Sequence, residues 1–62
     1  PLSERERQVL RLAADGRSAA AIAAEVYLSA GTVRNNLSAA IGKVGAGNRA
    51  QAVKIAQDKG WI

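Results

Sequence analysis

The chain has 62 residues, a formal net charge of +4 at pH 7 and an isoelectric point near 10.4, and it contains neither cysteine nor histidine. A chain of this length forms one domain that buries roughly 60% of its unfolded surface. The missing cysteines exclude disulfides and thiolate metal sites, and the missing histidines remove the commonest metal ligand and general base. We therefore expect no metal site, and the basic balance favours a polyanionic partner.

The sequence shows no membrane or export signal. No apolar run approaches membrane-spanning length, and no charged-then-apolar leader occurs, so we expect a cytoplasmic protein with no membrane partner. The chain begins at Pro1 rather than with methionine, which indicates a piece of a longer protein. Without internal repeats or a long linker, residues 1–62 are interpreted as one domain.

Residues 4–14 are predicted to form the first helix. Ser3 and Glu6 form a capping box, in which each side chain accepts a hydrogen bond from the other residue's backbone amide. Gly16 ends the helix in the left-handed conformation. The side chains expected to point inward are Val9, Leu10 and Ala13. The arginines that lie mostly outward, and that we interpret as a solvated face, are Arg5, Arg7 and Arg11.

Residues 19–26 are predicted to form a short second helix capped by Ser18. Its inward positions, at helical spacing, are Ala19, Ile22, Ala23 and Val26. A tight turn at residues 27–29 follows, with Leu28 filling the corner. Tyr27 either covers the core as a lid or presents its hydroxyl to a phosphate, and we favour the lid.

Residues 29–44 are predicted to form the helix around which the chain is organised, with Ser29 as its N-cap. At about 100° per residue, one arc is apolar and comprises Val33, Leu37, Ala40, Ile41 and Val44. The nearly opposite arc carries groups suited to reading base edges, namely Arg34, Asn35 and Ser38. A third flank, along which a phosphate backbone could lie, comprises Thr32, Asn36 and Lys43. An ordinary surface helix would show the same periodicity, so this stretch alone leaves that alternative open.

Residues 49–59 are predicted to form the last helix, with Asn48 as its cap and Gln51 placed for a variant capping box. Its apolar arc, comprising Ala52, Val53, Ile55 and Ala56, is wider than core contact requires. We therefore expect part of this arc to face a partner. Gly60 ends the helix, and Trp61 is interpreted as a structural lock that folds back onto it rather than as a platform for stacking bases.

A short helix, a tight turn and a longer helix with a polar outer face make a helix-turn-helix. The predicted fold is all-α, a compact four-helix domain containing this motif. The sequence also closely resembles the LuxR/NarL/GerE-type DNA-binding domain over essentially its whole length. The segments that carry the resemblance are residues 2–10 (LSERERQVL), Gly16, Ile22-Ala23, residues 29–33 (SAGTV), Lys43-Val44 and residues 48–52 (NRAQA).

The resemblance implies the C-terminal domain of a bacterial transcription regulator, downstream of a receiver or small-ligand-binding domain, and we expect the output domain of a two-component response regulator. The positions that match the family's base-reading sites are Arg34, Asn35 and Ser38. Thr32 and Lys43 match its phosphate-holding positions. The last helix matches its dimer interface, to which we assign Ala52, Ile55 and Ala56. The expected partners are double-stranded DNA at a pseudo-palindromic site, a second copy of the chain on that DNA, the upstream domain and RNA polymerase.

Several positions depart from the family pattern. Ala19 and Ala20 stand where an Asn-Lys pair is frequent, Asn36 replaces a common histidine, and Ser38 replaces a frequent lysine. The chain therefore offers fewer cationic contacts than the pattern would, which lowers the expected affinity for DNA.

Two other classes of function are alternatives to DNA binding. In a helical protein-interaction or dimerisation module the basic residues would only confer solubility, and such a module would not bind duplex DNA in a salt-sensitive manner. An enzyme is the least supported class, because the acids sit mostly at helix ends and no nucleophile–base pair occurs. We accordingly predict no catalytic residue and no cofactor.

Overall fold

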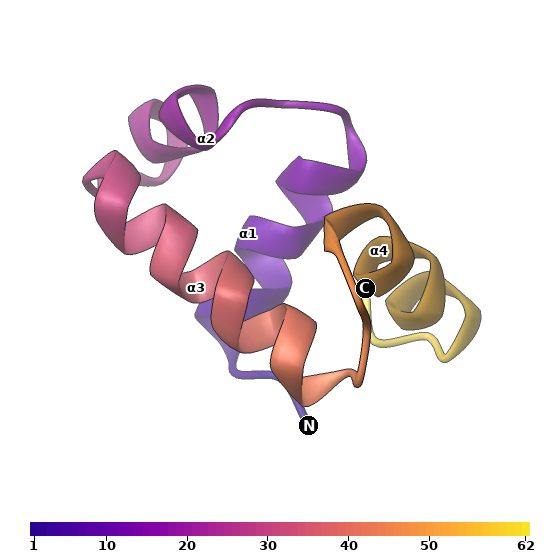
Figure 1. The fold of residues 1–62 in the computed structure, drawn as a ribbon. Coiled ribbons are helices and arrows are strands. Elements are labelled where there is room, and N and C mark those ends of the chain that lie inside the picture. Colours follow the sequence, from indigo (N-terminus) through magenta and orange to yellow (C-terminus); the bar gives the residue numbers. More distant parts are fainter.

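The computed structural model describes all 62 residues and contains four helices and no strand. These are α1 (Glu4–Ala14), α2 (Ala19–Val26), α3 (Ala30–Lys43) and α4 (Arg49–Asp58). The central helix is α1, with the α2–α3 pair on one side of it and α4 on the other (Figure 1). The predicted all-α fold is confirmed. No helix has the length and apolar character needed to cross a membrane.

Every helix begins at the predicted N-cap. The side chains of Ser3, Ser18, Ser29 and Asn48 each accept a hydrogen bond from the backbone amide three residues further on, at 2.8–3.1 Å. The capping box of α1 is complete, because the Ser3 amide also donates to Glu6 Oε1 at 2.8 Å. Gln51 differs from its prediction, since its side chain accepts from the Gly47 amide rather than from Asn48. Local sequence thus sets where the helices start.

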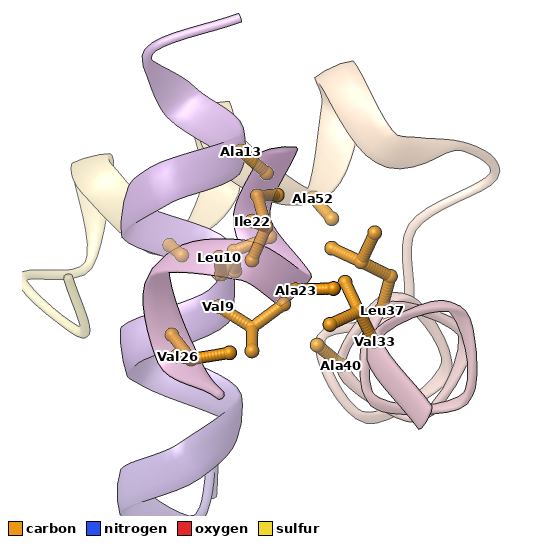
Figure 2. Packing of buried hydrophobic residues seen from close by; sticks show 11 residues of the cluster. Val9, Leu10, Ala13, Ile22, Ala23, Val26, Val33, Leu37, Ala40 and Ala52 are labelled. Carbon is orange, nitrogen blue, oxygen red and sulfur yellow. The ribbon is translucent and has the colours of Figure 1, made fainter. Parts of the chain in front are cut away.

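The core is aliphatic and draws on all four helices (Figure 2). Its largest fully buried side chains are Val9, Leu10, Ile22 and Val33, each with 0% exposure. The remaining buried apolar side chains are Ala13, Ala23, Val26, Leu37, Ala40, Ala52 and Ala56. At about 25 cal/mol per Å² of apolar surface, this burial is the main stabilising term in a domain without disulfides. Because α3 contributes Val33, Leu37 and Ala40, its inner side is fixed to the rest of the domain.

The turn between α2 and α3 corrects one prediction. Tyr27 is 93% exposed and adopts the left-handed conformation, with φ 59° and ψ 40°, so it does not form a lid on the core. This backbone conformation turns the phenol outward and carries Leu28 inward, where that side chain packs half-buried against the core. A tyrosine rarely adopts positive φ, and burial is the usual fate of an aromatic ring, which is why the lid prediction failed.

The C-terminal residues fold back as predicted. The Trp61 amide donates to the Ala56 carbonyl at 2.8 Å, and the ring is half-buried against the core. The Trp61 carbonyl accepts from Arg7 Nε at 2.8 Å, which ties the end of the chain to α1. The solvated-face prediction is therefore right for the exposed Arg5 and Arg11 and wrong for the half-buried Arg7.

Candidate nucleic-acid interface

The third helix has a locked inner side and an open outer side. Val33 and Ala40 have 0% exposure and Leu37 has 7%, so a continuous apolar line holds α3 against the domain. In Figure 2, Val33, Leu37 and Ala40 project from α3 toward the side chains of α1 and α2. The helix is thereby held with its opposite side in solvent, where an external partner can reach it.

The predicted base-reading residues all lie on the open side. Arg34, Asn35 and Ser38 are exposed. None of them uses its side chain within the domain, because the side-chain hydrogen bonds made by α3 involve other residues, namely Thr32, Asn36 and Lys43. The structure therefore presents a guanidinium and an amide together with all their hydrogen-bonding capacity available, and these are groups that form paired contacts with base edges.

The other residues on the open side of α3 have small side chains or none. Gly31, Ala39 and Gly42 are exposed there, and a Cβ placed on Gly42 would meet no atom within 4 Å. Arg34 is consequently the largest side chain that projects from this face and the only cation in α3 besides Lys43. A helix of this profile can lie close to the floor of a groove about 12 Å wide, which is the width of the major groove of B-form DNA.

The predicted phosphate-contacting residues have partners within the chain. Thr32 Oγ1 accepts from Ser29 Oγ at 2.9 Å, and Asn36 Nδ2 donates to the Thr32 carbonyl at 3.1 Å. Since the Thr32 hydroxyl only accepts in that contact, its own hydrogen remains available to a phosphate. Lys43 Nζ, in contrast, donates to Glu6 Oε1 of α1 at 2.8 Å.

The Lys43–Glu6 ion pair is a feature that the sequence analysis missed. The two residues are 37 positions apart, and only the fold brings them together. Glu6 is buried, with 6% exposure, and its pKa lies below its ordinary value. The hydrogen bond from Lys43 is the largest cause, and the hydrogen bond from the Ser3 backbone amide is the next. A buried carboxylate of this kind is ionised and depends on its partners.

The ion pairs of the chain show which of its cations have no acidic partner. Four of the nine cations form ion pairs, through the contacts Arg7–Glu4, Arg17–Glu25, Lys43–Glu6 and Lys54–Asp58. The other five cations, which form none, include Arg34. Arg34 is therefore the one cation of α3 whose charge is not matched by an acid of this chain, and it lies on the open side.

The fourth helix requires a correction. Ala52 and Ala56 were assigned to a dimer interface, but both have 0% exposure because their small side chains lie wholly inside the core. They are not accessible to a second copy, and that assignment is wrong for these two residues. Ile55 is half-buried and keeps part of its surface outside. A shallow groove of about 380 Å³ lies instead between the end of α1 and α4, lined by Ala13, Ala14, Arg49, Ala50 and Val53.

A two-helix unit of this geometry, with one side of its second helix buried and unpaired arginine and asparagine on the other, defines the helix-turn-helix class of nucleic-acid-binding domains. Residues 1–56 match the family described as bacterial regulatory proteins of the luxR family, and the chain belongs to it.

Three relatives illustrate its place in the family. The chain is 53% identical to the uncharacterized transcriptional regulatory protein YvfU of Bacillus subtilis over 62 residues, which are 100% of this chain and 31% of YvfU. It is 52% identical to the response regulator RamR of Streptomyces coelicolor over 98% of this chain and 30% of RamR. It is 43% identical to the transcriptional regulatory protein DesR of Bacillus subtilis over 100% of this chain and 31% of DesR. The chain thus spans about a third of the length of these relatives.

Proposed function

We propose that this chain is the sequence-specific DNA-binding domain of a bacterial transcription regulator and that it inserts the N-terminal part of α3 into the major groove. The observation that carries this proposal is the division of α3 between an inner side at 0–7% exposure and an outer side whose polar side chains have no partner in the domain. Membership of the luxR family of regulatory proteins supports the same function.

Base reading is assigned to the outer side of α3. Arg34 donates two hydrogen bonds to O6 and N7 of a guanine, which is the contact that a planar guanidinium makes best. Asn35 reads an adenine or a neighbouring base edge, and Ser38 reads a further edge one turn along the helix. These three residues are all exposed and need no rearrangement of the core to reach a base.

Backbone contacts set the register of the helix in the groove. Thr32 is exposed at the start of α3 and offers its hydroxyl hydrogen to a phosphate oxygen. Asn36 lies on the same flank and offers the amide hydrogen that its bond to the Thr32 carbonyl leaves free. Lys43 is the remaining residue predicted for this role, and its ammonium group already donates to Glu6.

The full-length protein is proposed to be a cytoplasmic response regulator that carries a receiver domain before this chain. The support is the likeness to RamR, which is a response regulator, together with the short span of each relative that the chain covers. On a pseudo-palindromic site, two copies would bind half-sites about one helical turn apart. They would meet through the groove at Ala50 and Val53, and RNA polymerase would be the downstream partner. Ile55 leaves α4 about 160° from Val53, at about 100° per residue, and so lies outside this surface.

Selection of bound sequences from random duplex DNA tests the proposal. We expect a defined half-site to be enriched. We also expect log K to fall against log salt with a slope of about −2 to −4 per domain, at about 0.9 for each neutralised phosphate. Retention that is independent of salt and sequence would favour the protein-interaction module instead.

The dimer is tested on a duplex that carries two half-sites. Ala50 is exposed and lines the α4 groove, so Ala50→Glu should abolish cooperative binding while leaving the affinity for one half-site nearly unchanged. Gln51→Glu is the matched control, because it introduces the same charge on the neighbouring flank and keeps the oxygen that accepts from Gly47. Cooperativity that survives Ala50→Glu would exclude this interface.

A further inference from the structure

One buried carboxylate joins the start of α1 to the end of α3. Glu6 Oε1 accepts from the Ser3 amide at 2.8 Å and from Lys43 Nζ at 2.8 Å. The Glu6 side chain is 8% exposed, whereas the Lys43 side chain is 46% exposed. The lysine therefore reaches inward from the surface to an acid that has little access to bulk water and no other ion-pair partner.

The position of Lys43 on α3 sets it apart from the base-reading residues. Lys43 follows Arg34 by nine positions, so at about 100° per residue the two side chains leave the helix on sides about 180° apart. The ammonium group lies against α1, on the side of α3 away from the guanidinium. Lys43 Nζ has two further hydrogens besides the one given to Glu6, so the direction of the side chain is what separates it from the groove. A phosphate that drew the ammonium away from Glu6 would leave this buried carboxylate without its cation, which is unfavourable.

The other anchors of α3 are apolar, and the Lys43–Glu6 pair is the one side-chain ion pair that α3 makes with another helix. Val33, Leu37 and Ala40 form one apolar line, and the hydrophobic free energy that they contribute depends on buried area rather than on direction. A charge-assisted hydrogen bond from the last residue of the helix to a rigid capping box is directional and short. Lys43 lies about 13 Å along the helix axis from Arg34, at 1.5 Å per residue. A small tilt or rotation of α3 at Lys43 therefore moves the Arg34 guanidinium.

We propose that Lys43 is a positioning residue for DNA binding, which fixes the orientation of α3 through Glu6 and thereby aims Arg34, and that it contacts no phosphate. This inference rests on the proposed DNA-binding function and changes the role of one of its residues. It also makes Glu6, which lies on a different helix, a determinant of base preference.

The test compares Lys43→Met, Glu6→Gln and the double variant on the selected duplex and on random duplex, at a temperature where circular dichroism shows each to be folded. If Lys43 positions α3, each single variant lowers the affinity for the selected site by about fivefold or more, as expected for partial loss of one bidentate base contact. The affinity for random DNA and the salt slope stay near those of the wild type. The double variant is no weaker than the singles, and Lys43→Arg, which retains the pairing, restores base preference.

Loss of a phosphate contact has a different signature. Lys43→Met would then flatten the salt slope by about 0.9 and weaken binding to both duplexes equally. Glu6→Gln, which retains an acceptor for the Ser3 amide and frees Lys43, would leave affinity unchanged or raise it. Either result overturns the inference while the proposed function stands. A wild-type chain that does not discriminate between the two duplexes overturns the proposed function itself.

Discussion

The two halves of α3 differ in how much of their surface is available to a partner. In the first half, Arg34 and Asn35 are exposed and unpaired. In the second half, Ser38 is also exposed and unpaired, but Lys43 at the end is held by Glu6, and the exposed Ala39 and Gly42 carry little or no side chain. The comparison shows that a cation on α3 is not automatically unpaired, because an acid from another helix can already bind it. We call the first half of α3, which carries Arg34 and Asn35, the reading half, and the second half, which ends at Lys43, the anchored half.

The largest effect is expected at Val33, on the inner side of the reading half. Val33→Asp places an ionised carboxylate at a position with 0% exposure and should unfold the domain, because burying an unpaired charge costs more than the roughly 5 kcal/mol that stabilises a small domain. Far-ultraviolet circular dichroism should show loss of helix. Arg34→Asp, one residue further on and exposed, is the control that should remain folded. Cooperative thermal unfolding of Val33→Asp at the wild-type midpoint would refute the inward orientation.

The anchored half should respond to acid. The pKa of Glu6 is lowered in the folded chain, first by the hydrogen bond from Lys43, relative to an ordinary value of 4.5. The stability that this carboxylate contributes is therefore fully present above about pH 5 and is lost as pH falls through the folded pKa. Urea unfolding between pH 7 and pH 3 should show the wild type converging on Glu6→Gln at the acid end. A constant difference between the two proteins across this range would contradict the ion pair.

A smaller effect is expected at Gly42. Gly42→Ala should raise the free energy of unfolding by about 0.5–1 kcal/mol, because glycine in a helix is less favourable than alanine and the added Cβ meets no atom within 4 Å. Binding to the selected duplex should change by less than about twofold, which is about 0.4 kcal/mol, because Gly42 lies in the last turn of α3, beyond the N-terminal part that is proposed to enter the groove. Reduced DNA affinity in this stabilised variant would place DNA against the last turn of α3 as well.

Local features of the structure could be predicted from sequence, and long-range ones could not. The N-caps at Ser18, Ser29 and Asn48 depend on side chains and amides three residues apart, so their pattern is visible in the sequence. The Lys43–Glu6 pair depends on how α1 crosses α3, which periodicity does not specify. The inner and outer positions of α4 were not separated either, because an arc of alanine, valine and isoleucine does not show which members a small core encloses completely.

In the candidate site too, the local features could be predicted from sequence and the long-range contacts could not. Helical spacing was sufficient to place Arg34, Asn35 and Ser38 together on one exposed side of α3. It was not sufficient to show that Arg34 is free of acidic partners while Lys43 is not. The exposure of Tyr27 follows from a left-handed backbone residue, and nothing in a tyrosine predicts that conformation.

The central claim is that Arg34 reads a base, and a comparison of two duplexes tests it most directly. The first duplex carries the selected half-site, and the second differs from it at the one base pair assigned to Arg34. The wild-type chain should prefer the first duplex by about 1–3 kcal/mol. Arg34→Ala should bind both with nearly equal affinity while still discriminating at the base pairs assigned to Asn35 and Ser38. If Arg34→Ala instead weakens binding to both duplexes by the same factor and retains the preference, Arg34 is a backbone contact and the account is wrong.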